Sequence, residues 1–245
     1  MDGRDYEAEK IMIWVNEKAI HDYSKRDVVG QAISALGHCA ETKTVCHSWL
    51  SSSLPKRFIF NHFYGEFLSG GSRKSILDIG GGLTGFTRQL ARDHDYTLVD
   101  IMAHDDKTLG RSLEKSVGRE FLQVEDWFGY LQRNSNKRWD AVIANDLLPN
   151  VDQRLVPFLE TILPRACKIM VSLTYHNSWK WYLTRRVGAD EMLTQMSWDH
   201  SMLSSVLERY RDRIIGPNFS KFGQENTSVY PNGRQVCLVT LAEAG

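Results

Sequence analysis

The chain has 245 residues, of which 42% are hydrophobic and 24% charged, a balance that suits one α/β domain with additions. Lys plus Arg and Asp plus Glu both number 30, so no net charge draws the chain toward nucleic acid or anionic lipid. No stretch approaches the roughly 20 apolar residues of a membrane span, and the polar N-terminus is unlike a secretory signal. We therefore expect a cytoplasmic protein that binds neither nucleic acid nor membrane.

Residues 1–70 carry helical patterns rather than strand patterns. Apolar side chains recur at helical spacing at Ile11, Trp14 and Val15, and again at Val28, Ala32 and Ala35. The stretch 58–67 is rich in phenylalanine and is soon followed by Gly70 and Gly71. We expect an N-terminal helical cap over 1–70, followed by one domain over 71–245.

From Ser75 onward, short apolar strands recur at regular intervals. They are expected at 76–79, 96–100, 121–124, 141–145 and 169–173. Each interval has room for one crossover helix and two loops, as parallel pairing requires. Leu155 and Leu159, four residues apart, mark one such helix. The pattern predicts an α/β fold with a doubly wound, mostly parallel sheet.

The C-terminal part does not follow this regular spacing of strands. Residues 227–230 and 235–241 flank an Asn-Gly turn, which predicts a hairpin and an antiparallel closing strand at the sheet edge. Residues 174–222 exceed what one crossover needs and are expected to form a helical insertion. Within it we expect a long helix over about 190–213 and a solvated helix face at 180–186. This insertion and the N-terminal cap are expected to cover the ligand site.

A glycine cluster follows the first of these strands. Gly80, Gly82 and Gly85 satisfy G-x-G-x-x-G, and Asp100 follows about twenty residues later, a signal shared by two cofactor classes. The carboxylate of Asp78 separates them. It would repel the pyrophosphate of a dinucleotide but attract the ammonium and sulfonium of S-adenosylmethionine (SAM). We therefore expect SAM as the cofactor.

Polar residues end the neighbouring strands at the same predicted sheet edge. Asp100 is placed to accept the ribose hydroxyls, and Asp126 with Trp127 to contact adenine. Asn145 and Asp146 end the fourth strand and are expected to face the reacting centre. Each acid alone could be a helix N-cap, but their common register with the glycine loop favours a binding site.

Over about residues 60–245 the chain resembles the class I SAM-dependent methyltransferases. The run from Leu77 to Gly82 looks like that family's first motif, and the run from Trp139 to Leu148 like its fourth. The triple glycine is similar to that of small-molecule O-methyltransferases. The cofactor-binding residues that the resemblance implies are Asp78, Gly80, Gly81, Gly82, Gly85, Asp100, Ile101, Asp126, Trp127 and Asn145.

The methyl acceptor is expected to be a small metabolite. Asn145-Asp146-Leu147 lacks the Pro-Pro-aromatic stretch of base-modifying relatives, and the choice between N and O stays open. His176 and His200 are candidate general bases, and Asp146 could orient an amine. No metal site is expected, since the spacing of Cys39 and Cys46 fits no common zinc pattern.

Two other functions remain open alternatives. An NAD(P)-dependent oxidoreductase would use a similar glycine loop, although Asp78 disfavours it. A non-catalytic SAM-binding scaffold would show the same binding residues. Whether the chain forms a homodimer is also left open.

Overall fold

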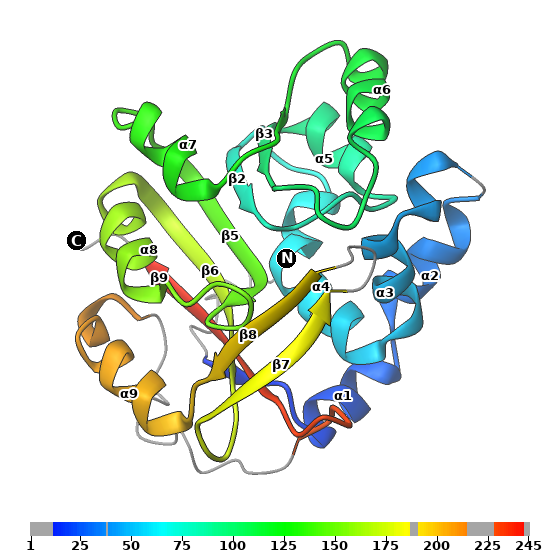
Figure 1. Ribbon diagram of the computed structural model, residues 1–245. Helices are drawn as coiled ribbons and strands as arrows, with labels where there is room; N and C mark the ends of the chain where they lie inside the picture. Colours follow the sequence, from blue (N-terminus) through cyan, green and yellow to red (C-terminus); the bar gives the residue numbers. More distant parts are fainter. Residues whose placement is uncertain (1–11, 38, 187–190, 215–227, 243–245) are drawn as a thin grey trace, which may run out of the picture.

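A seven-stranded sheet forms the centre of the molecule in the computed structural model, which describes residues 12–37, 39–186, 191–214 and 228–242 (Figure 1). The strand order is β1-β9-β6-β5-β2-β3-β4. Neighbours from β6 to β4 are parallel, whereas β9 is antiparallel to β6 and to β1. The strands are β1 Ile13–Trp14, β2 Ser75–Ile79, β3 Asp95–Val99, β4 Leu122–Gln123, β5 Trp139–Leu148, β6 Ala166–Tyr175 and β9 Gln235–Ala242.

Helices cover both faces of this sheet because the strands carry apolar side chains on both. Alternate residues of a strand point to opposite faces. Leu77 and Ile79 of β2 accordingly pack with α7, α8 and α9 (His200–Glu208), whereas Ile76 packs with α4 (Leu54–Leu68), α5 and α6. The crossover helices are α5 Thr87–Asp93, α6 Lys107–Val117, α7 Trp127–Arg133 and α8 Leu155–Ile162. The predicted α/β class and its five parallel strands are confirmed.

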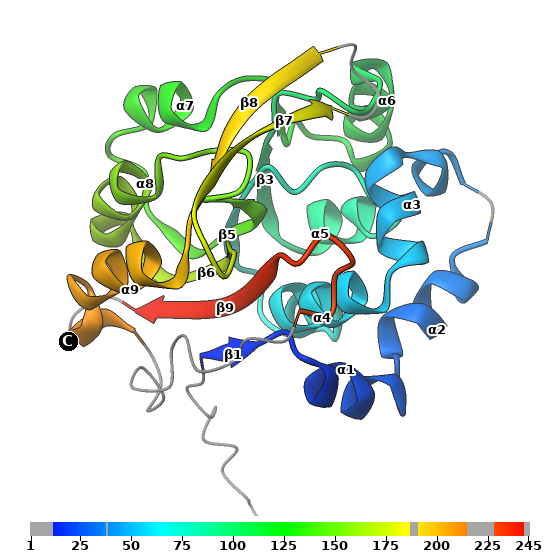
Figure 2. The ribbon, with the colours of Figure 1, turned by 60° about the horizontal axis from the view of Figure 1, so that its bottom comes forward.

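The N-terminal segment is helical, as predicted, except for the short strand β1 near its start. It contains α1 Glu17–Ser24, α2 Val28–Ala35, η1 Ala40–Lys43, α3 Val45–Ser52 and α4 Leu54–Leu68. Trp14 was expected in a helix, but it lies in β1, where it pairs with Cys237 of β9 (Figure 2). An edge strand of the central sheet therefore comes from the N-terminal segment.

The expected helical insertion contains a β-hairpin. Strands β7 Lys180–Arg186 and β8 Glu191–Ser197 form a separate two-stranded sheet across the front of the molecule in Figure 1. Among the described residues of the insertion, only α9 His200–Glu208 and the short η3 Arg211–Arg213 are helical, so the predicted long helix and the helix face at 180–186 are wrong. The helix starts late because Asp199 is its N-cap and accepts from Met202 N at 3.0 Å.

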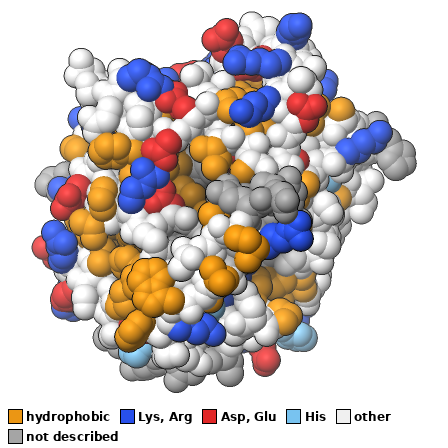
Figure 3. Space-filling model, in the orientation of Figure 1, with side chains coloured by type: hydrophobic (Ala, Val, Ile, Leu, Met, Phe, Trp, Pro, Cys, Tyr) orange, Lys and Arg blue, Asp and Glu red, His pale blue; other side chains and the backbone are white. Residues whose placement is uncertain are grey.

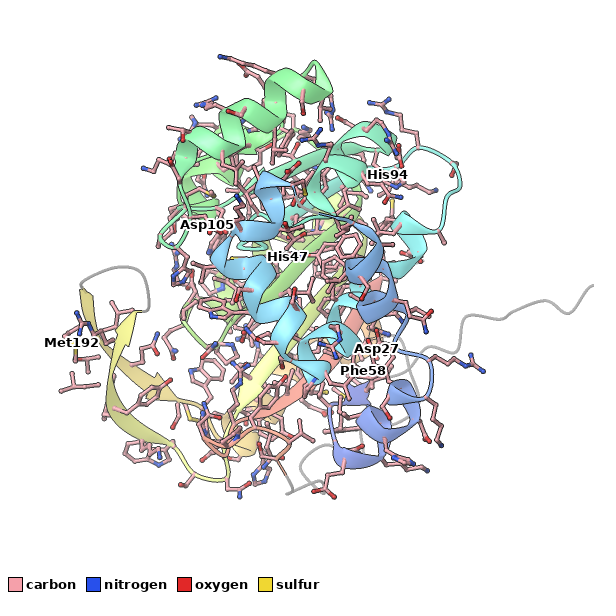
Figure 4. All side chains as sticks on the ribbon, turned by 90° about the vertical axis from the view of Figure 1, so that its right-hand side faces the viewer. Asp27, His47, Phe58, His94, Asp105 and Met192 are labelled. Atoms are coloured by element: carbon pink, nitrogen blue, oxygen red, sulfur yellow. The ribbon has the colours of Figure 1, made fainter. Side chains whose placement is uncertain are left out.

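The outward side of the hairpin carries large apolar side chains. Trp179, Trp181, Leu183 and Met192 are exposed there. Figure 3 shows hydrophobic side chains on this front face, and Figure 4 places Met192 at the outer end of the hairpin.

The predicted C-terminal hairpin is half correct. β9 is antiparallel, as expected, but it pairs with β6 and β1. Residues 228–230 are irregular rather than a strand and lead into a turn at 231–232, and Thr227 lies outside the described residues. Gly233 adopts φ 76° and donates to Tyr230 O at 3.0 Å, which closes the turn before β9. In the described part of the chain, no helix is long and apolar enough to cross a membrane.

Docking of β1 can be tested at Met12, which is 1% exposed and packs with the α7–α9 side of the core. Met12→Ala should lower the free energy of unfolding by about 2–5 kcal/mol, because a buried side chain is lost and a cavity remains. Denaturant unfolding measures this, with the exposed Val28→Ala as the control. Equal stabilities of the two variants would mean that this segment is not docked.

Candidate functional site

The carboxyl ends of the parallel strands meet the start of β9 at one edge of the sheet, since Tyr175 of β6 pairs with Gln235 of β9. Two compartments lie over this edge. The α3–α4 compartment has a volume of about 160 Å³ and includes Cys46, Trp49, Lys56, Phe60 and Arg234. The α7 compartment has a volume of about 470 Å³ and includes Ile101, Asp126, Trp127 and Arg154. Both are lined by Gly80, Asp100, His104, Leu147 and Val151, so they form one cleft.

The glycine loop forms the floor of this cleft. Gly80 and Gly82 adopt φ 70° and 66°, a region in which other residues are strained. Gly81 does not have a positive φ, but a side chain there would collide with the Asp78 carboxylate directly below. A side chain on Gly82 would meet the Cys46 thiol. The loop therefore exposes backbone to the cleft, because neighbours fill the space on its other sides.

Asp78 lies beneath the loop rather than in the cleft. Its side chain is buried, and its Oδ2 accepts from Tyr64 at 2.9 Å and from Tyr96 at 2.7 Å. Its Oδ1 is buried without a hydrogen-bond partner among the described residues. Burial raises the pKa of Asp78 to about 7, although the two hydroxyls oppose this shift. Asp78 can therefore act on a ligand only through its charge, from below Gly81.

Asp100 ends β3 where the two compartments meet. Its Oδ2 accepts from Gly82 N at 3.1 Å and its Oδ1 from Met102 N at 2.6 Å. Burial raises its pKa. Each carboxylate oxygen can accept a further bond, so Asp100 fixes the loop and can still bind hydroxyl groups. Ile101 beside it is half exposed and offers an apolar surface to the α7 compartment.

Asp126 and Trp127 line the α7 compartment, as the sequence predicts, but the Arg154 side chain contacts both of them. Asp126 caps α7 and binds the Arg154 guanidinium at 2.5 and 3.1 Å, which lowers the pKa of its carboxyl. The same guanidinium lies 4.7 Å from the centre of the Trp127 ring. Trp127 is almost fully buried. A base stacked on this ring would have to displace Arg154.

Asp146 and Asn145 lie at the end of β5, in the α3–α4 compartment. Asp146 N donates to Ser172 Oγ at 2.7 Å, and that hydroxyl donates to Asn145 Oδ1 at 3.0 Å. The Asp146 carboxylate binds Arg234 at 2.8 Å and Lys56 at 3.4 Å. Burial favours a raised pKa, but the two cations outweigh it and lower the pKa of Asp146. Asp146 therefore stays ionised and is a weak base.

Besides Asp78, three predicted residues do not reach the cleft. His176 N donates to Trp198 O at 2.8 Å as the chain turns into the hairpin, and its side chain lines neither compartment. Burial lowers its pKa. His200 is exposed on the first turn of α9. Gly85 lies against α2 and α3, where its N–H donates to His47 Nδ1 at 3.2 Å.

Several residues of the cleft were missed by the sequence analysis. Lys56 and Trp49 come from the N-terminal helices, Arg234 directly precedes β9, and His104 follows β3. The His104 ring packs edge-on to Trp49, with the centres 4.9 Å apart. Asp105 accepts from Val45 N at 2.8 Å and so holds the first turn of α3 against this loop (Figure 4). Only Arg234 left a local signal, as a charged residue between a turn and an apolar strand.

No protein-family model matches the sequence, and no curated protein matches it. Among solved structures, the N-terminal domain of EvdMO1 with S-adenosylhomocysteine (SAH) bound is 17% identical, with a TM-score of 0.51 over 90% of this chain and 97% of that chain. The DhpI–SAH complex is 15% identical, with a TM-score of 0.43 over 92% and 96%. The 16S rRNA methylase ArmA is 14% identical, with a TM-score of 0.42 over 91% and 97%.

At identities this low, a similar structure is evidence for the fold alone. The evidence for the fold of this chain is its similarity to the EvdMO1 domain. The protein has the fold of the class I SAM-dependent methyltransferases, as its motifs predict. Its glycine loop and the acid that ends β3 lie in the cleft at the carboxyl edge of the sheet, where open α/β sheets bind ligands.

The buried state of Asp78 predicts a pH-dependent stability. Its pKa is raised from 3.8 to about 7, so the native state binds this proton more tightly than the unfolded chain does. That contribution is complete below about pH 4 and is lost as the pH rises through about 7. The free energy of unfolding of the wild type should therefore fall by about 4 kcal/mol between pH 4 and 8, relative to Asp78→Asn.

Denaturant titrations of both proteins at each pH measure this difference. Both proteins contain the other titratable groups, so the difference reports Asp78 together with its interaction with Asp100. A difference that stays constant with pH would show that Asp78 is not buried as described.

Proposed function

We propose that the protein binds SAM in this cleft and transfers its methyl group to a nitrogen or oxygen atom of a small-molecule acceptor. The observation that carries the proposal is the glycine loop that joins two compartments, with Asp100 at the junction. The EvdMO1 domain, which has the same fold, holds SAH, the product that SAM leaves after methyl transfer. That likeness supports an adenosyl cofactor here.

The residues of the cleft fit this cofactor. Asp100 would accept the ribose hydroxyls, and Ile101 and Asp126 would face adenine in the α7 compartment. Gly80, Gly81 and Gly82 would hold the methionine part, since a cofactor can approach their bare backbone. The buried Asp78 Oδ1, which has no hydrogen-bond partner in the described part of the chain, lies under Gly81, where its charge would stabilise a cationic ligand above the loop.

When bound, SAM supplies a methyl group that its positively charged sulfur already activates. The chain must then position the acceptor and exclude water. Trp49, Leu50, Phe60 and Val236 provide apolar walls for this in the α3–α4 compartment.

A hydroxyl acceptor would also need a base, and we assign that role to His104. His104 lines both compartments, whereas the predicted bases His176 and His200 line neither. Asp146 lines the acceptor side, but Arg234 and Lys56 keep it ionised and weakly basic. An amine acceptor could release its proton after transfer and would need no strong base.

Cofactor binding tests the proposal directly. SAM and SAH should raise the melting temperature, because they bind only the folded state, and NAD should not. Asp100→Asn should raise the Kd for SAH by about 10- to 100-fold in calorimetry, because the ribose hydroxyls lose a charged acceptor. Asp93→Asn, in an ion pair with Arg92, is the matched control. Stabilisation by NAD alone would contradict the proposal and favour an oxidoreductase.

Turnover distinguishes an enzyme from a SAM-binding scaffold. SAH release from SAM, measured against a library of small amines and alcohols, should identify an acceptor. For a hydroxyl acceptor, His104→Ala should lower kcat/KM by about 10²–10⁴-fold, with little change in the Kd for SAH. Failure of the whole library, with SAH binding intact, would favour a scaffold.

A further inference from the structure

The acceptor side of the α3–α4 compartment has two cations for one carboxylate. Arg234 and Lys56 both bind Asp146, at 2.8 and 3.4 Å. The other acids of this compartment are directed at backbone N–H groups. Asp100 accepts from Gly82 and Met102, and Asp105 accepts from the first turn of α3. The cluster of Lys56, Asp146 and Arg234 therefore carries one positive charge in excess.

Both cations are held in position before any acceptor binds. The Lys56 ammonium lies 4.7 Å from the centre of the Trp49 ring, and the Arg234 guanidinium 4.2 Å from that of Tyr230. Their side chains are only 27% and 13% exposed, so water screens them little. The backbone of Lys56 is fixed in α4, and that of Arg234, directly before β9, donates to Asn232 Oδ1 at 3.2 Å.

The sheet places this cluster away from the glycine loop. In the strand order β9-β6-β5-β2, three strand spacings separate Arg234 from the end of β2, about 14 Å in all. Asp146 lies near the end of β5, between them. The cluster therefore faces the part of the cleft beyond the glycine loop, where an acceptor would lie.

We propose that the Lys56–Asp146–Arg234 cluster is a subsite for a carboxylate group of the methyl acceptor, which is thus a small organic acid with an apolar body. This inference rests on the proposed function. The two cations keep donors that can bind a second carboxylate, and Trp49, Phe60 and Val236 surround the apolar body. An amine is disfavoured here, because Asp146 already binds two cations.

Matched pairs of acids and amides test the subsite in protein saturated with SAH. The probes are phenylacetate with phenylacetamide and 4-hydroxybenzoate with 4-hydroxybenzamide, measured by calorimetry. At least one acid should bind about tenfold or more tightly than its amide. Equal affinity within both pairs, or no acid binding below about 1 mM, would overturn the inference.

Two substitutions should shift the Kd for the acid in opposite directions. Lys56→Gln should raise it about 10- to 100-fold, because one cationic donor is lost. Asp146→Asn should lower it several-fold, because a competing negative charge is removed. Lys25→Gln, an exposed lysine paired with Asp22, is the control and should change nothing.

The Kd for SAH separates this inference from the proposed function. It should stay within about twofold in both cluster variants. If Lys56→Gln weakens SAH as much as the acid, the cluster binds the carboxylate of the cofactor and the inference is overturned. If the wild type does not bind SAH, the proposed function fails and this inference fails with it.

Discussion

Burial of the Asp78 carboxylate beneath the glycine loop is the constraint on which the rest of the site depends. Tyr64 of α4 and Tyr96 of β3 donate to one of its oxygens and so connect the N-terminal helices to the first two parallel strands. Gly81 passes over the other oxygen, where a side chain would collide. No cation among the residues that the structure describes pairs with this buried carboxylate, which is costly, and that cost appears as a pKa raised to about 7. A cation above the loop would reduce it, whereas a neutral ligand would not.

The N-terminal helices are part of the site as well as of the core. Helix α4 supplies Tyr64 below the glycine loop and Lys56 in the acceptor compartment. Helix α3 places Cys46 against Gly82 and Trp49 beside His104. None of the described residues of 174–214 lines either compartment. Of the two segments expected to cover the ligand site, the N-terminal one therefore provides the walls.

The sequence could predict those parts of the site that depend on local pattern. The apolar strands and the glycine run are both local patterns. Because the carboxyl ends of parallel strands share one edge of the sheet, the sequence also predicts that Asp100 and Asp146 lie in the same site. The contact of Arg234 with Asp146 joins distant parts of the chain, so no local pattern reveals it. The hairpin was missed because its strands have mixed polarity and become recognisable only through pairing. His176 follows β6 as expected, but the turn into that hairpin takes it away from the cleft.

Hydrogen exchange with and without SAH is the most direct test of the central claim, that the cleft over the glycine loop binds an adenosyl cofactor. The account predicts slower exchange of the amides at 80–84 and 100–104, which surround the junction of the two compartments. The β7–β8 hairpin should be unaffected, since its described residues line neither compartment. Protection confined to the hairpin, or no protection at SAH concentrations far above those expected to saturate the site, would contradict the account.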